Sequence, residues 1–311
     1  MNQKTQKKTI GESTKTDFKV SFTMLKENYK AFIATELFAI VAFLITYMVL
    51  FSILSLIYII LPNLSVSDLF VSIKQNYNSS RLFVALITLL SYIVLVGFLN
   101  CQYGLAYDIF SSGDMFAEFK SSFSYFRKHW WKYVLLTFIM GISMFIPDRR
   151  FIHPVKITSI TSVEITLVIT LRILQFVLSW IFLVIFSITL PSVTAQGSFT
   201  KSFDESFKIL KENPKRLITT WGVYFLVFQL PLLVFSLLTI SLTVAGIDII
   251  LIRIMLVFVV LSYLLIIFIG MPMRALLATR IYNSLIFANV QKTEGETEKK
   301  EIMNKKKEQN E

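Results

Sequence analysis

The sequence predicts an all-α, polytopic membrane protein with six transmembrane helices. Hydrophobic residues make up 55% of the 311 positions and charged residues only 16%, unlike the composition of soluble globular proteins. Several apolar stretches reach the roughly 20 residues that a helix needs to cross a hydrocarbon core. An eight-residue sequence also returns ahead of apolar runs, which predicts three parallel two-helix repeats, each preceded by an amphipathic interfacial helix.

The apolar stretches place the membrane-spanning segments. Five of them are long, at residues 31–61, 82–107, 166–190, 217–244 and 249–271. We expect a sixth, shorter span at residues 133–147; without it, the two termini would lie on opposite sides of the membrane. The first stretch is far longer than the apolar core of a cleaved signal peptide, about 7–15 residues, so we expect it to remain as a signal anchor.

The repeated sequence is SFTMLKEN at residues 21–28, SFKILKEN at 206–213 and, in degenerate form, SFSYFRKH at 122–129. Around each copy, apolar residues recur at i, i+4 and i+7, which places them on one stripe of a helix. These residues are Phe18, Phe22 and Leu25; Phe119, Phe123 and Phe126; and Phe203, Phe207 and Leu210. Lysines occupy much of the remaining surface, and this combination beside a span is typical of helices that lie in the membrane plane.

The last residue of the motif is expected to mark an elbow between the in-plane helix and the following span. Pro214 directly follows Asn213, and the residue before a proline is disfavoured in α-helical geometry. Asparagine is a good N-cap and proline a good first helical residue. We therefore expect Asn28 and Asn213 to cap helices rather than to bind a ligand. His129 takes this position in the second copy, which argues against a catalytic histidine there.

The distribution of positive charge predicts the orientation. Of the 31 lysines and arginines, 24 lie in the N-terminal arm, in the segments 120–132 and 201–216, and from Arg274 onward. The positive-inside rule then places both termini in the cytoplasm, in a protein integral to the plasma membrane. A nucleic-acid partner is the weaker explanation of the net charge of +11, because the charges flank spans instead of forming one patch.

With every unit starting on the cytoplasmic side, the repeats are parallel and span about residues 17–110, 111–197 and 198–288. Gly113 and Gly197 precede the second and third in-plane helices, where we expect turns that need relaxed backbone geometry.

Two polar segments flank this transmembrane domain of residues 17–288. Residues 1–16 and 289–311 carry too little apolar surface to fold alone, so both are expected to be disordered. The N-terminal arm is basic and is expected to contact anionic lipid headgroups better than the C-terminal tail, which mixes glutamate with lysine. The alternative is that both segments are solvated and have no specific function.

The Ser-Phe-x-x-Leu-Lys-x-Asn element ahead of paired spans resembles the membrane domain fused to some glycerophosphodiester phosphodiesterases, and related uncharacterised six-helix membrane families. The resemblance covers roughly residues 18–285. It implies a helical polytopic domain whose membrane part carries no catalytic residues. Nothing in the sequence resembles the separate phosphodiesterase domain of those enzymes.

The residue types needed for catalysis or metal binding are scarce. The chain has a single cysteine, Cys101, and two histidines, His129 and His153, expected in separate aqueous regions. These residues predict neither a disulfide framework nor a metal site, and we expect no cofactor. The sequence also has no phosphate loop, no His-Glu-x-x-His and no Gly-x-Ser-x-Gly. We therefore predict a protein that is not an enzyme.

Four residues in or beside the spans are candidates for a polar pathway: Glu36, Asp108, Arg172 and Pro231. Charges inside a membrane are costly and therefore suggest function. Glu36 and Asp108 could form a cytoplasmic cluster with Arg274, whereas Arg172 is more simply explained by extension of its side chain to the outer interface. A packing kink is the simpler explanation of Pro231, ahead of a transport pathway.

Three functions are compatible with these observations. The first is a non-enzymatic protein that binds or organises lipids or partner proteins at the cytoplasmic membrane face through its in-plane helices. The second is a transporter or channel for a small solute, and the third is a lipid-modifying enzyme, which the missing catalytic motifs disfavour. We favour the first, because leucine, isoleucine, valine and phenylalanine dominate the spans and leave few polar groups for a solute route.

Overall fold

The computed structural model describes residues 10–60, 77–111, 116–141, 162–244 and 249–286. The helices are α1 (Ile10–Ile60), α3 (Tyr77–Leu99), α4 (Gln102–Ser111), α5 (Phe119–Gly141), α6 (Ser162–Phe186), α7 (Thr189–Gln196), α8 (Phe199–Glu212), α9 (Pro214–Tyr224), the π-helix η3 (Phe225–Gln229), α10 (Leu230–Val244), α11 (Ile249–Leu265), the π-helix η4 (Ile266–Gly270) and a last helical segment, 271–286. The all-helical class predicted from the sequence is confirmed for this part of the chain.

Five helical stretches in the described ranges are long and apolar enough to cross a membrane, which is consistent with a membrane protein. They are Ser13–Ile53, Ile87–Ser111, Ile169–Gln196, Pro214–Thr243 and Ile250–Ile286. Each contains most of one of the five long spans predicted from the sequence. The sixth predicted span starts inside α5, which ends at Gly141, and its residues 142–147 lie outside the described residues.

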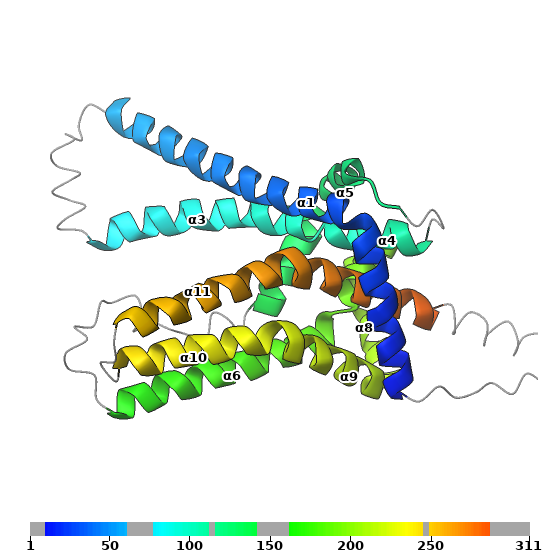
Figure 1. Ribbon diagram of the computed structural model, residues 1–311. Helices are drawn as coiled ribbons and strands as arrows, with labels where there is room; N and C mark the ends of the chain where they lie inside the picture. The colour runs from blue at the N-terminus through cyan, green and yellow to red at the C-terminus, as the bar shows by residue number, and fades with distance from the viewer. Residues whose placement is uncertain (1–9, 61–76, 112–115, 142–161, 245–248, 287–311) are drawn as a thin grey trace, which may run out of the picture.

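The long helices run side by side, and shorter helices gather at one end of them (Figure 1). α1 packs along α3, and α10 packs along α11. The first part of α1, in the darkest blue, lies across the ends of the other helices, and α1 then bends into its long apolar part (Figure 1). We call the end where α4, α7, α8, α9 and segment 271–286 gather the packed end of the bundle.

Nearly all of the buried core lies at the packed end. Its fully buried large side chains come from different helices and include Phe32, Leu105, Tyr133, Leu190, Trp221 and Leu276. Along the long helices, by contrast, large apolar side chains are exposed, among them Met48 of α1 and Val257 of α11. An apolar surface of this extent is typical of protein that faces lipid. The chain thus has a tightly packed end and apolar helices that extend from it.

Three long helices, α3, α6 and α11, depart from regular α-helical hydrogen bonding where they enter the packed end. α3 ends before Asn100, α6 ends before Ser187, and α11 changes into the π-helix η4. The Asn100 side chain donates to the Val96 carbonyl at 3.0 Å and to Thr137 Oγ1 at 2.7 Å. Tyr224 donates its hydroxyl hydrogen to the carbonyl of Gly270 at 3.0 Å. Side chains therefore satisfy buried polar groups beside the helix breaks.

The predicted disturbance at Pro231 is present and has a local cause. Pro231 is the second residue of α10 and follows the π-helix η3. A proline removes one helical hydrogen bond and clashes with the carbonyl four residues earlier, and a π turn widens the helix where that bond is missing. This geometry gives a local structural reason for the helix distortion before Pro231.

The two predicted elbows, at Asn28 and Asn213, have different backbone conformations in the structure. Asn213 has φ −132° and ψ 45° between α8 and α9, so the chain does break there, although the Asn213 side chain forms no capping hydrogen bond. The predicted helix end at Asn28 is wrong, because α1 continues through it. Only Asn213 is followed by a proline, and the residue before a proline is the one forced out of helical geometry.

The predicted glycine turn before α8 is confirmed. Gly197 has φ +68°, a left-handed conformation that favours glycine, and its N–H donates to the Val193 carbonyl to end α7. Lys132 donates to the carbonyl of Gly197 from α5. The other predicted glycine turn, at Gly113, lies outside the described residues. Residues 10–16, predicted as part of a disordered arm, form the first turns of α1.

Close packing of α4 against α5 gives a test of this fold. A Cβ atom at Gly104 would lie 2.2 Å from the ring of Tyr125, which is held by its hydrogen bond to Asp108. We expect Gly104→Ala to destabilise the purified protein by about 1–3 kcal/mol, measured by thermal unfolding in detergent. Gly222→Ala is the matched control, since a Cβ atom at that position would meet no neighbouring group within 4 Å. Equal melting temperatures for the two variants would contradict the packing described here.

Candidate functional site

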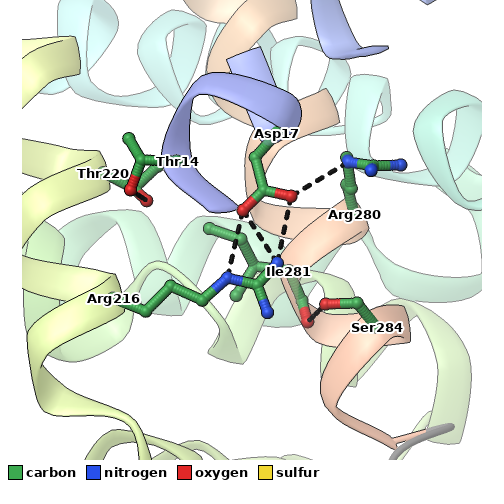
Figure 2. Close-up of polar contacts among 7 residues, drawn as sticks. All are labelled: Thr14, Asp17, Arg216, Thr220, Arg280, Ile281 and Ser284. Carbon is green, nitrogen blue, oxygen red and sulfur yellow. Dashed lines mark hydrogen bonds and ion pairs between the residues drawn. The ribbon is translucent and has the colours of Figure 1, made fainter. Parts of the chain in front are cut away.

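The packed end of the bundle holds most of the buried polar side chains, and three joints connect its helices. The first joint is Asp17, on the first part of α1. Arg216 of α9 donates from Nε and Nη2 to Asp17 at 2.7–3.0 Å, and Arg280 donates from Nε to Asp17 Oδ1 at 3.0 Å (Figure 2). Beside this joint, the hydroxyl groups of Thr14 and Thr220 lie 3.4 Å apart (Figure 2). Asp17 therefore connects the start of the described chain to α9 and to its last helical segment.

The second joint is Glu205 of α8. Its Oε2 accepts hydrogen bonds from Ser192 Oγ of α7, from Gln196 Nε2 at 2.6 Å and from Tyr282 Oη at 2.9 Å. The carboxylate thereby holds α7, α8 and segment 271–286 together. A charged acceptor makes each of these bonds stronger than a neutral one would be.

The third joint is α4, which contains Asp108 and contacts Glu36 and Arg274, the three residues predicted to form one polar cluster. Gln102 donates to Glu36 Oε1 at 2.7 Å, and Asp108 accepts from Tyr125 at 2.5 Å. The guanidinium of Arg274 lies 6.0 Å from the ring centroid of the α4 residue Tyr103, within cation–π range. Arg274 is thus held through aromatic rings.

Glu36 and Arg274, predicted to cluster with Asp108, each contact a residue of α4, whereas Asp108 is an α4 residue whose carboxylate accepts from Tyr125 of α5. Glu36 is fully buried, and its Oε2 has no hydrogen-bond partner in the part of the chain that the structure describes. Arg172 lies in α6, but its side chain is outside the described residues. Pro231 lies in α10, on a different helix from each of these.

The three copies of the motif occupy comparable environments. The first serine of each copy is buried: Ser21, Ser122 and Ser206 are at most 2% exposed. The phenylalanine that follows is exposed in every copy: Phe22 by 58%, Phe123 by 40% and Phe207 by 50%. Each helix therefore turns its serine into the bundle, while its phenylalanine lies partly exposed at the surface. Phe123 also packs edge-on against Phe38 of α1, and Phe207 against Phe186 of α6.

The other residues of the predicted apolar stripe differ in how far they are exposed. Phe18, Phe119 and Phe203 are half-buried, as are Phe126 and Leu210, whereas Leu25 is buried in the core. A stripe at i, i+4 and i+7 is wide enough to reach from the exposed face of a helix to the edge of its packed face. The prediction of one stripe facing the membrane therefore holds best for its central phenylalanine.

Aromatic rings connect two of the motif helices to the preceding helix of the bundle. Phe98 of α3 stacks on Phe126 of α5, with ring centroids 3.9 Å apart. Phe186 of α6 lies edge-on to Phe203 of α8, with centroids 5.7 Å apart. Such pairs stabilise contacts beyond the area that they bury. The first motif helix, in α1, is held instead by Asp17 and its two arginines.

The last residue of the motif is buried in the first two copies. Asn28 donates to the Met24 carbonyl at 3.0 Å and accepts from the Ala117 N–H at 2.7 Å, so its side chain connects α1 to the residues before α5. His129 is fully buried, and neither of its ring nitrogens has a hydrogen-bond partner among the described residues. Asn213, at the break between α8 and α9, is half-buried.

Sequence reasoning missed the Asp17 and Glu205 joints. One available signal was the small polar face of the first part of α1, where Thr14, Asp17 and Ser21 recur at i, i+3 and i+7. All three side chains are buried. The hydrogen-bond partners of Thr14 and Asp17, however, lie 199 to 263 residues away, and such pairing cannot be read from one sequence.

A metal centre finds no support within the described ranges, where no three histidine, cysteine or acidic side chains gather. Cys101 is buried as a free thiol and donates to the Gly97 carbonyl at 3.3 Å. The predicted second histidine, His153, lies outside the described residues. The observed chemistry of the packed end is therefore hydrogen bonding and ion pairing between helices.

Comparisons with models of protein families, with curated proteins and with solved structures give no significant match to this chain. The resemblance to the membrane domain of phosphodiesterases thus rests on the Ser-Phe motif and its position ahead of the spans.

The environment of His129 predicts a dependence of stability on pH. Burial, together with the positive charges of Lys132 and Lys128, lowers the pKa of His129 to about 4. Below a pH of about 6.5 the unfolded chain takes up a proton that the folded chain excludes, so stability falls as the pH drops toward 4. We expect the melting temperature to fall between pH 7.5 and pH 5, by on the order of 2–5 °C from this residue.

His129→Asn tests this assignment, because asparagine occupies the same motif position in the other two copies and does not titrate. The variant should lose that part of the pH-dependent change while it melts near the wild-type temperature at pH 7.5. An unchanged pH dependence in the variant would show that His129 is not the group responsible.

Proposed function

We propose that this chain is a non-enzymatic multi-pass protein of the plasma membrane that binds and organises lipids or partner proteins at the cytoplasmic face. In this proposal the chain has six spans in three parallel two-helix repeats. An amphipathic in-plane helix precedes each pair, and both termini are cytoplasmic. The packed end of the bundle then lies at the cytoplasmic headgroup layer, and the apolar ends of the long helices extend into the bilayer.

The observation that carries the proposal is the common orientation of the motif helices. In all three, the first serine is buried and the next residue, Phe22, Phe123 or Phe207, is exposed. An exposed phenylalanine on a basic helix is stable where it can enter the acyl boundary of a membrane while lysines meet the headgroups. Three such side chains on one protein support a lipid-facing role for the motif helices.

Two further observations support the cytoplasmic placement. Exposed lysines accompany the exposed phenylalanines, including Lys19 and Lys26 on α1 and Lys208 on α8. Exposed Trp130 and Trp131 lie on α5, about two turns after the second motif phenylalanine. Tryptophan is enriched at membrane–water interfaces, and positive charge is enriched on their cytoplasmic side.

Transport of a small solute is the second candidate, and Glu36 is the observation that favours it. A buried carboxyl group with an unbonded oxygen, within the Ser13–Ile53 span, could serve an ion or a proton. The polar side chains around Glu36 nevertheless form hydrogen bonds that hold helices together, such as the bond from Gln102. This arrangement favours lipid or partner binding over transport.

A screen of thermal stability separates the two functions. We expect phospholipids to raise the melting temperature of the detergent-purified protein, because a ligand that binds only the folded state stabilises it by mass action. The triple variant Phe22→Ala, Phe123→Ala and Phe207→Ala should show a clearly smaller lipid-dependent shift than the wild type.

The matched control truncates three equally exposed apolar side chains along the spans, by Met48→Ala, Leu56→Ala and Leu261→Ala. This control should keep a larger lipid-dependent shift than the phenylalanine variant. Equal losses in both triple variants would contradict a specific role of the motif helices. A shift produced by a soluble ion or solute and by no lipid would favour transport.

A further inference from the structure

The Asp17 joint leaves hydrogen-bond donors unused. Arg280 uses only Nε to bond Asp17, and Arg216 uses Nε and Nη2. Both amino groups of Arg280 and Nη1 of Arg216 form no hydrogen bond to Asp17. The arginine side chains are 25% and 18% exposed, whereas that of Asp17 is only 3% exposed. The open edges of both guanidinium groups therefore remain within reach of solvent or lipid.

The charge of the joint is also incomplete. Two guanidinium groups share one carboxylate, so the cluster keeps a net positive charge. Thr14 and Thr220, beside it, are neutral (Figure 2), and the charged sequence neighbours Lys15, Lys215 and Glu212 together add one positive charge. An anion would complete this arrangement.

We propose that Arg216 and Arg280 bind a phosphate group, supplied by the headgroup of an anionic phospholipid or by free phosphate, and that Asp17 positions both guanidinium groups for it. The planar fork of arginine matches the oxygens of phosphate and donates two hydrogen bonds in parallel. Because Asp17 fixes each Nε, the free amino groups are already oriented, and binding costs less side-chain entropy.

The lipid form of this proposal rests on the function proposed above, because the joint lies at the packed end, which that function places among the cytoplasmic headgroups. Asp17 is on the first part of α1, five residues before the exposed Phe22. A lipid whose acyl chains pack near that phenylalanine could present its phosphate at the same level. Free phosphate, which has no acyl chains, would be bound by Arg216 and Arg280 alone.

The experiment measures binding to the full-length protein in detergent by native mass spectrometry. Phosphatidylglycerol supplies an anionic headgroup, and phosphatidylcholine is the zwitterionic comparison. The wild type should bind the first lipid at least about tenfold more tightly, the factor that corresponds to 1.4 kcal/mol. Equal affinities of the wild type for the two lipids would overturn the lipid form of the proposal without any variant.

Arg280→Lys keeps a cation beside Asp17 but removes the fork, and it should lower the affinity for phosphatidylglycerol about tenfold. Arg280→Gln should lower that affinity further. Arg253→Gln removes one exposed arginine of α11, outside the motif helices, and should change it by less than about twofold. Equal losses for Arg253→Gln and Arg280→Gln would show general charge attraction and no site. Melting temperatures without lipid report whether each variant is folded.

A parallel melting series with inorganic phosphate, against chloride at matched ionic strength, distinguishes the two sources. A phosphate-dependent shift that Arg280→Lys removes indicates that free phosphate occupies the site. Binding of phosphatidylglycerol alone indicates a headgroup site. If lipids stabilise Arg280→Lys as well as the wild type, the phosphate site is wrong but the lipid-binding function stands. If no lipid stabilises the wild type, the proposed function itself fails.

Discussion

The ion pairs of Asp17 with Arg216 and Arg280 are the interaction on which the packed end depends. The first part of α1 lies across the ends of the other helices (Figure 1), and its buried face there is polar, with Thr14, Asp17 and Ser21. Apolar burial alone would not fix a helix with such a face. A buried carboxylate is costly unless it is paired, and Arg216 and Arg280 pair it from two helices far along the chain. One residue thus connects the start of the described chain to its last helix.

The division between a packed end and extended apolar helices is consistent with lipid around the long helices. In lipid, apolar surface gains little from mutual burial, and the long helices carry exposed leucine, valine and isoleucine along their length. Polar groups need partners in such surroundings. They gather where the helices break, at Asn100, Ser187 and Gly270, and hydrogen bonds of Asn100 and Tyr224 satisfy groups at two of these breaks. Joints of this kind specify how the helices meet.

Features that depend on nearby residues could be predicted from the sequence, and those that depend on distant pairing could not. The five long spans follow from runs of apolar residues, and the break at Asn213 follows from Pro214. The continuity of α1 through Asn28 could not be predicted, because its side chain bonds Ala117, 89 residues away. Leu25 was placed on the correct stripe, but only packing shows that it lies on the buried edge of that stripe.

The central claim is that the three motif helices lie together in one headgroup layer, and membrane depth tests it most directly. In a Cys101→Ser background, spin labels at Phe22→Cys, Phe123→Cys and Phe207→Cys can be measured in vesicles by their accessibility to oxygen and to a water-soluble relaxing agent. We predict one shared shallow depth for all three labels, with Met48→Cys much deeper. A label in bulk water, or three labels at different depths, would contradict the claim.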